Sequence, residues 1–374
     1  MTKDIENSLI EAIACTIDQV ALGNPYRQIG FDDGKNRLGW VKDASFARVK
    51  ESVKNASYLF EGKKNFIFIG MGGSINGIKP LFSIFESSSF HTLDNLDPEA
   101  ISNILKKIDD LESTLVISIS KSGTTKETQL LSLTLKEVFS RRLGPDKWKQ
   151  HFLWLSDVSS FEKLDEFGWD GVKKVPIQFD AEVDIGGRFS SPHTFIFILP
   201  LFLLLGKDLD KLENIYNSFI ALKGKVRQEA KRICEQISEK PDAYFSPHTS
   251  KELGESFSSW IVQLFQESLG SKLDNFPVKT LTNIDDKGFV PLGLSMDIED
   301  SAVALMSQMY FFQIFIAFYA GEKNINFVTQ GFVEKYKNQM RELEGQEREG
   351  EEPEVLELDS LIAQTNEHIK PEHR

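Results

Sequence analysis

The chain has 374 residues, more than one typical domain, so we expect two domains. Its hydrophobic content of 41% and charged content of 26% are typical of a soluble globular protein, and its net charge of −13 argues against nucleic acid and anionic membranes as partners. Cys15 and Cys234 lie far apart without metal-type spacing, which indicates a reducing compartment and no disulfide framework. The polar, acidic first residues are not those of a signal peptide.

Residues 1–60 have a mostly helical pattern. The apolar positions of Ile5–Ile17 and of Ser45–Phe60 recur as on one face of a helix. Neither stretch carries side chains that indicate chemistry. We therefore expect a helical lead-in to the first domain.

A buried strand is predicted at Phe66–Ile69, and glycines follow it directly. Their spacing does not match the dinucleotide-binding fingerprint, so the stretch is weak as a cofactor site. Gly72 and Gly73 let the backbone approach a ligand, and Ser74 is expected to cap the next helix. This stretch is thus predicted to be an anion-facing loop.

The stretch Leu115–Thr128 repeats this design, as a strand over Leu115–Ile119, a polar loop and a helix start. The loop carries hydroxyls, a lysine and a glycine, namely Ser120, Lys121, Ser122, Gly123, Thr124 and Thr125. Free N–H groups and the helix dipole favour a phosphate at such a junction. A well-capped helix start is the alternative, but it needs only one hydroxyl. Both loops should lie at the carboxyl edge of a parallel sheet, where ligands bind.

Further strands are predicted at Phe152–Leu155 and Lys174–Ile177, which indicates a parallel α/β sheet. Arg188 follows Gly186 and Gly187, where its forked donors can reach a ligand; a surface arginine in a turn is the alternative. His193 precedes an apolar helix and is interpreted as structural rather than catalytic. That apolar stretch, Phe195–Gly206, is too short to span a membrane.

A second α/β block is predicted after a long helix over Leu209–Ile237. In the helix Glu252–Gly270, Gln263 and Glu267 lie four residues apart and share a face, although a solvated glutamate is the alternative there. The remaining expected elements are strands at Phe276–Val278 and Gly288–Leu294 and helices at Ser301–Tyr319 and Gly331–Leu343. After about Arg341 the composition is that of an acidic, partly disordered tail.

Five stretches, in this order, together resemble the glucose-6-phosphate isomerase family. They are Gly72-Gly73-Ser74, Ser120–Thr125 with Glu127-Thr128, Gly186–Ser190, Gln263–Gly270 and Asn326–Lys337. The resemblance covers roughly residues 40–340. It implies two doubly wound parallel-sheet sugar-isomerase-like domains, at residues 61–215 and 216–340, between the helical lead-in at 1–60 and the acidic tail at 341–374.

The resemblance also implies a cytoplasmic, homodimeric glycolytic and gluconeogenic enzyme that interconverts glucose 6-phosphate and fructose 6-phosphate without metal or cofactor. Ser74, Ser120, Ser122 and Thr125 would hold the phosphate, assisted by Gly73 and by backbone N–H groups from Lys121 to Thr124. Glu267 would move the proton between C2 and C1, and Arg188 would stabilise the charge of the intermediate. Lys337, Gln330 and Gln263 would complete the sugar site.

The chain departs from the family in one way that bears on catalysis. The family places a histidine after the catalytic glutamate, whereas this chain has none between His248 and His368. Two alternatives therefore stay open. Beside the implied glucose 6-phosphate isomerase, they are a phosphosugar-binding module without catalysis and an isomerase of another sugar phosphate, such as mannose 6-phosphate.

Overall fold

The computed structural model describes residues 30–32, 34–238, 244–247, 254–270, 289–323 and 325–329. The chain forms two compact units that alternate along the sequence. Unit 1 is drawn from Met1–Phe46, Asn76–Phe85 and Val183–Lys337, and unit 2 from Ala47–Ile75, Glu86–Glu182 and Asn338–Arg374. The first predicted helix, the strand at 276–278, the last helix and the acidic tail lie outside the described residues.

Unit 2 is built on a five-stranded parallel sheet with the order β4-β3-β5-β6-β7. The strands are β3 (Asn65–Gly70), β4 (Phe90–Leu93), β5 (Thr114–Ile119), β6 (Phe152–Ser156) and β7 (Lys173–Pro176). Every residue of β5 and β6 is buried, as in a parallel sheet with both faces covered. In the register of the central pair, Ile67 lies opposite Val116.

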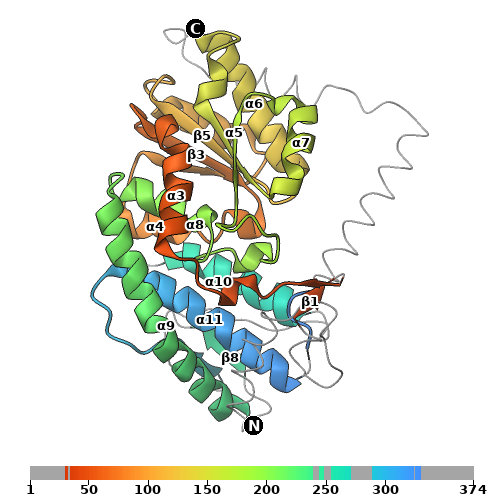
Figure 1. Cartoon of the computed structure of the whole chain (residues 1–374), viewed down its shortest axis with the longest axis vertical. Helices are drawn as coiled ribbons and strands as arrows, with labels where there is room; N and C mark the ends of the chain where they lie inside the picture. Colours follow the sequence, from red (N-terminus) through yellow and green to blue (C-terminus); the bar gives the residue numbers. More distant parts are fainter. Residues whose placement is uncertain are drawn as a thin grey trace, which may run out of the picture. The chain divides into compact units, whose positions relative to one another are not determined.

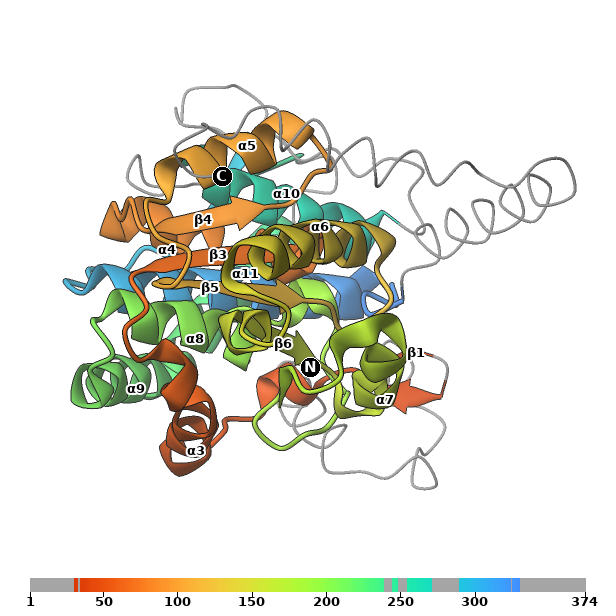
Figure 2. The same ribbon diagram turned by 90° about the horizontal axis from the view of Figure 1, so that it is seen from above.

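Helices α3 (Phe46–Ala56), α5 (Pro98–Lys107), α6 (Lys126–Leu143) and α7 (Phe161–Leu164) complete unit 2. Helix α5 begins where Asp97 accepts a hydrogen bond from Glu99 N and Pro98 occupies the first turn. Leu105 of α5 and Leu135 of α6 share a core with Ile67 and Val116 of the sheet. Helices α5 and α6 therefore pack on one face of this sheet (Figure 2).

Unit 1 is mainly helical. Its helices are α4 (Lys79–Phe85), α8 (Phe195–Leu204), α9 (Leu209–Ser238), α10 (Gly254–Leu269) and α11 (Ser301–Lys323). Helices α9 and α11 pack side by side, and α4 contacts α8, α10 and α11 (Figure 1). The described part of this unit also contains two short strand pairs, the antiparallel β1 (Phe31–Asp32) and β2 (Lys35–Asn36) and the parallel β8 (Tyr244–Pro247) and β9 (Phe289–Leu292).

Short helical turns connect these elements. They are η2 (Gly39–Val41), η3 (Ser57–Phe60), η4 (Gly72–Ser74), η5 (Trp148–His151), η6 (Val158–Ser160), η7 (Asp165–Trp169) and η8 (Gly187–Phe189). In the core of unit 1, Trp40 of η2 stacks on Phe189 of η8 with ring centroids 5.0 Å apart. Helix α11 is long and apolar enough to cross a membrane, but most of its side chains are buried in the protein, as in a core helix.

The α/β class and the parallel sheet predicted from sequence are confirmed. The strands predicted at 66–69, 115–119, 152–155 and 174–177 appear as β3, β5, β6 and β7. Strand β4 and helix α5 were not predicted. The expected boundaries at residues 60, 215 and 340 remain a proposal.

Candidate active site

The two glycine- and hydroxyl-bearing loops lie at neighbouring strand ends in unit 2. Strand β3 ends at Gly70 and strand β5 at Ile119, and the two residues are paired. From β3 the chain continues to β4 on one side, whereas β5 lies on the other side. This reversal of strand order is the point at which open α/β sheets bind ligands, outside the carboxyl ends of the strands. The predicted common edge of both loops is thus confirmed.

In the polar loop of residues 120–125, the side-chain hydroxyls contact one another in pairs. Ser120 Oγ lies 3.0 Å from Thr125 Oγ1, and Ser122 Oγ lies 2.8 Å from Thr124 Oγ1. Thr125 occupies the N-cap position of α6, but its side chain makes no capping hydrogen bond. The hydroxyls therefore do not serve as a simple cap, and the positive end of an 18-residue helix dipole begins at this loop.

Two carbonyl groups of this loop accept hydrogen bonds from serine side chains outside the loop. Ser156 Oγ donates to Ser120 O at 2.6 Å, and Ser160 Oγ donates to Lys121 O at 3.2 Å. In a trans peptide the C=O and the next N–H point in opposite directions. The N–H groups of Lys121 and Ser122 consequently point away from the side on which Ser156 and Ser160 lie.

A second brace holds Gly123. Gln129 Nε2 donates to Gly123 O at 2.6 Å, and Gln129 Oε1 accepts from Trp169 Nε1 at 2.8 Å. Gly123 has a φ of +66°, and an added Cβ would lie 3.1 Å from Leu164 Cγ. The backbone conformation and the close approach both require glycine here. Sequence reasoning missed Gln129, Ser156 and Ser160, although Ser156 ends the next strand, β6, and Ser160 follows it at the same sheet edge.

The glycine loop after β3 approaches the end of β5 closely. A Cβ at Gly70 would lie 3.3 Å from Ile119 O and 3.3 Å from Ser74 Cβ, so a larger residue there would require its neighbours to shift by a few tenths of an ångström. The prediction that Ser74 caps a helix is wrong, because Ser74 lies in η4 and α4 begins only at Lys79. Pro80 explains the late start, since proline is tolerated in a first helical turn and not in a helix interior.

Arg188 of unit 1 is buried rather than exposed in a turn. Its Nε donates to Ser268 Oγ at 2.9 Å, and its Nη2 donates to Phe327 O at 2.5 Å. Its Nη1 lies 3.7 Å from Glu267 Oε2. Burial lowers the pKa of Arg188 to about 10, and the charge of Glu267 acts against this shift. The guanidinium is therefore still a fixed cation near neutral pH.

Glu267 belongs to a chain of side-chain hydrogen bonds. Gln263 Nε2 donates to Glu267 Oε1 at 2.9 Å, and Gln263 Oε1 accepts from Asn76 Nδ2 at 2.8 Å. The predicted shared face of Gln263 and Glu267 is confirmed. The Glu267 side chain keeps 25% of its surface exposed, so the carboxylate is accessible although Arg188 beside it is not. Asn76 was missed, and nothing in its local sequence points to this contact.

The remaining predicted residues divide into two groups. His193 is half-buried, and its Nε2 lies 2.8 Å from Gln313 Oε1, as expected of a satisfied histidine. Burial, followed by the charge of Lys223, lowers its pKa well below the usual value. Gln330 and Lys337 lie outside the described residues.

The architecture resembles those of two solved proteins. A glucose-6-phosphate isomerase from Chlamydia trachomatis matches with a TM-score of 0.63 at 16% identity, over 96% of this chain and 88% of that one. A hypothetical protein from Thermus thermophilus matches with a TM-score of 0.63 at 20% identity, over 90% of this chain and 94% of that one. These similarities establish the fold.

Curated relatives share more sequence over shorter stretches. A glucose-6-phosphate isomerase of Thermus thermophilus is 32% identical over 177 residues, 47% of this chain and 41% of the relative. That of Campylobacter jejuni is 31% identical over 243 residues, 62% of this chain and 56% of the relative. A rice enzyme named cytosolic B is 32% identical over 206 residues, 50% of this chain and 34% of the relative. The matches thus span between about a third and just over half of these relatives.

A parallel α/β sheet with two polar loops at its switch point defines the class as α/β proteins with the phosphosugar-isomerase fold. The model of the phosphoglucose isomerase family matches residues 12–217. The chain belongs to the phosphoglucose isomerase family.

Proposed function

We propose that the chain is an aldose–ketose isomerase that interconverts glucose 6-phosphate and fructose 6-phosphate through an enediol intermediate. The observation that carries this proposal is the pairing of Glu267 with Arg188, a partly exposed carboxylate 3.7 Å from a buried cation. This isomerisation needs a base that moves a proton between neighbouring carbons and a cation for the oxyanion that develops. Membership of the phosphoglucose isomerase family supports the choice of substrate.

In this proposal Glu267 takes the proton from C2 of the open-chain sugar and returns it to C1. Arg188 stabilises the negative charge that forms on the substrate oxygen. Its guanidinium is anchored on Ser268 and on Phe327 O, so it need not reorganise as the charge develops. Gln263, Gln330 and Lys337 are proposed to contact the sugar.

The phosphate is assigned to the loops of unit 2. The proposed donors are the hydroxyls of Ser74, Ser120, Ser122, Thr124 and Thr125, together with the N–H groups of Gly73, Lys121, Ser122 and Thr124. The Gly123 N–H donates to Ser120 O at 3.1 Å and helps to shape the loop. The braces from Ser156, Ser160 and Gln129 would fix the loop before the ligand arrives, which lowers the entropy cost of binding. Lys121, whose Nζ lies 3.9 Å from Asp157 Oδ2, would supply the local positive charge.

We further propose that the enzyme works in the cytoplasm as a homodimer, in glycolysis and gluconeogenesis. The rice relative is named as a cytosolic enzyme, which supports this location. The absence of a histidine between His248 and His368 keeps the non-catalytic binding module as the competing hypothesis.

Exchange of the C2 hydrogen of glucose 6-phosphate with solvent deuterium tests this proposal. Glu267→Gln keeps the shape and removes the proton acceptor, so exchange and turnover should fall by roughly 10²-fold or more. Binding of 6-phosphogluconate should change little, because other residues are assigned to the phosphate. Glu235→Gln, at an exposed position on α9, is the matched control.

Two results would redirect the assignment. Binding without any exchange in the unmutated protein would favour the binding module. Turnover of mannose 6-phosphate in preference to glucose 6-phosphate would change the substrate and leave the role of Glu267 intact.

A further inference from the structure

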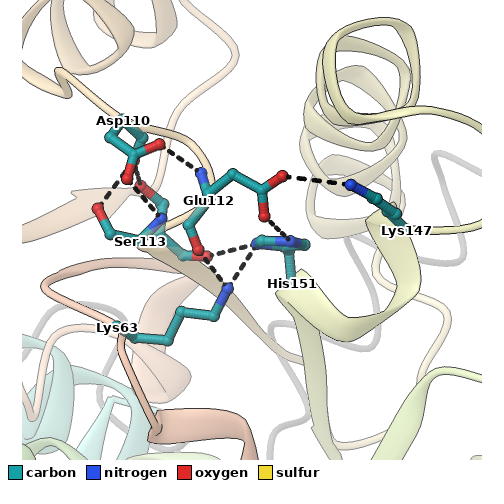
Figure 3. Close-up of polar contacts among 7 residues, drawn as sticks. Lys63, Asp110, Glu112, Ser113, Lys147 and His151 are labelled. Carbon is teal, nitrogen blue, oxygen red and sulfur yellow. Dashed lines mark hydrogen bonds and ion pairs between the residues drawn. The ribbon is translucent and has the colours of Figure 1, made fainter.

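The unit 2 sheet carries a second polar cluster at the edge opposite to the two loops, where strands β3, β5 and β6 begin (Figure 3). Its members are Lys63, Asp110, Glu112 and His151, which we call the amino-edge cluster. Lys63 lies just before β3, and His151 lies just before β6. None of these residues has a part in the proposed isomerisation, so the cluster can be tested independently of it.

Lys63 and His151 are in direct contact. Lys63 Nζ lies 2.7 Å from His151 Nδ1 and 2.6 Å from Glu112 O. The imidazole is buried, with only 1% of its side chain exposed, whereas Lys63 is half-buried. Lys63 is thus partly accessible to solvent, while the imidazole beside it is shielded.

The same ring nitrogen has a second neighbour, Thr114 O at 3.1 Å. A carbonyl can only accept a hydrogen bond and an ammonium can only donate one, so the two neighbours require opposite states of Nδ1. If Lys63 is an ammonium, Nδ1 accepts from it. If Lys63 is a neutral amine, Nδ1 can still accept one of its N–H groups, and the Nζ lone pair is then available for reaction. Nδ1 can therefore take up a proton that leaves Nζ, and Thr114 O can accept the hydrogen bond that the protonated Nδ1 then donates.

The surroundings of Lys63 shift its protonation equilibrium toward the neutral amine. Burial lowers the pKa of Lys63 to about 8, while the charges of Glu112 and Asp110 act in the other direction. Burial also lowers the pKa of His151, so its ring is neutral near pH 7 and Nδ1 can act as a hydrogen-bond acceptor. Lys147 Nζ lies 3.8 Å from Glu112 Oε1 and partly offsets that carboxylate.

We propose that Lys63 is a site of covalent acylation by small uncharged thioesters, with His151 as the proton acceptor. The Nζ lone pair attacks the thioester carbonyl carbon and forms a C–N bond, and the C–S bond breaks with its electron pair on sulfur. The proton leaving Nζ passes to His151 Nδ1 and from there to the thiolate. The products are an amide on Lys63 and a free thiol, and no oxidant or reductant is needed.

The charge of the cluster selects the donor. The carboxylates of Asp110 and Glu112 disfavour anionic donors at this edge, so an uncharged thioester should react in preference to a charged one. The product has no positive charge on Lys63. The attraction between Lys63 and the carboxylate of Glu112 is then lost.

The test uses the full chain and S-acetyl-N-acetylcysteamine, an uncharged thioester, at pH 7.5. Cleavage after Phe60 and Phe66 yields one peptide with both Lys63 and Lys64, and fragmentation separates the two acetylation sites. Lys64 is exposed and is the internal control. An amine with a pKa of about 8 has roughly 100-fold more neutral form at this pH than an ordinary lysine.

Partial burial and the lower intrinsic nucleophilicity of a weaker base reduce this advantage, so we expect Lys63 to react about 10-fold faster than Lys64. Its rate should level off above about pH 8, while that of Lys64 continues to rise. Equal or slower acetylation of Lys63 would overturn the proposal.

Two variants test the assigned roles. Glu112→Gln removes an exposed charge that raises the pKa of Lys63, so the rate at pH 7 should rise roughly 3-fold, whereas Glu99→Gln on α5 should change nothing. His151→Gln should lower the ratio of Lys63 to Lys64 acetylation about 10-fold or more. An unchanged ratio in the folded variant would exclude His151 as proton acceptor. If that variant does not fold, the Glu112→Gln comparison still decides, because a slower or equal rate contradicts the proposal.

Discussion

Asn76 Nδ2 donates a hydrogen bond to Gln263 Oε1 at 2.8 Å, although 187 positions separate the two residues. This contact fixes which end of the Gln263 amide faces Glu267. With the oxygen directed at Asn76, the Nε2 group is directed at the carboxylate, 2.9 Å from Oε1. Asn76 is therefore a positioning residue for the proposed base.

Asn76→Asp should disturb the orientation of the Gln263 amide, because a carboxylate cannot donate a hydrogen bond to Gln263 Oε1. The amide of Gln263 would then lose its fixed orientation beside Glu267. We expect kcat to fall about 10-fold with a smaller change in KM. Asn103→Asp, at an exposed position on α5, is the matched control. Steady-state kinetics measures both, and equal kcat values for the two variants would contradict a positioning role.

Thr125→Glu places a carboxylate at the N-terminus of α6, in the position assigned to the phosphate. Affinity for 6-phosphogluconate, measured by calorimetry, should fall by about 100-fold or more. Ser88→Glu adds the same charge at an exposed site before β4 and should leave affinity within about 2-fold. Undiminished binding by folded Thr125→Glu would remove this loop from the site.

Gly123→Ala tests the crowding of the same loop. Gly123 and Gly62 have similar φ angles, +66° and +69°, but a Cβ at Gly123 meets Leu164 at 3.1 Å, whereas at Gly62 nothing lies within 4 Å. Gly123→Ala should therefore lower the free energy of unfolding about 1 kcal/mol more than Gly62→Ala. It should also weaken 6-phosphogluconate binding. Chemical denaturation of both variants gives the comparison, and equal losses would show that Leu164 gives way.

His193 predicts a pH dependence of stability. Its pKa is well below the usual value in the folded chain, so between pH 7.5 and 5.5 the unfolded chain takes up a proton that the folded chain does not. Stability from this group is therefore complete above pH 7.5 and falls as the pH falls. The expected loss is about 1.4 kcal/mol between pH 7.5 and 5.5. Denaturation curves give the free energy of unfolding at both pH values. The difference between the two pH values should be about 1.4 kcal/mol smaller in His193→Gln than in the unmutated protein, and an unchanged difference would contradict the assignment.

The strands that were predicted correctly are those with continuous apolar runs. Strand β4 was missed because it is an edge strand with half-buried His91 and Thr92, and its pattern does not separate it from a loop. Helix α4 was placed too early because Ser74 was given more weight than Pro80.

The site residues were also predicted only where the local sequence carries a recognisable pattern. Ser120–Thr125, Arg188, Gln263 and Glu267 were found because each belongs to a local pattern. Asn76 and the brace on Gly123 from Gln129 and Trp169 depend on partners far along the chain or on tertiary packing. Single-sequence patterns carry no information about such contacts.

The alternation of the two units constrains the order in which the chain can fold during synthesis. Helix α4 leaves the ribosome between strands β3 and β4, yet its packing partners α8, α10 and α11 are made more than 100 residues later. The sheet of unit 2 has all its strands once residue 176 has emerged, while the buried residues Pro80 and Leu81 of α4 still lack their neighbours. A nascent chain paused there would expose an apolar segment that a chaperone can bind, and a fragment that starts at residue 183 would lack α4 altogether.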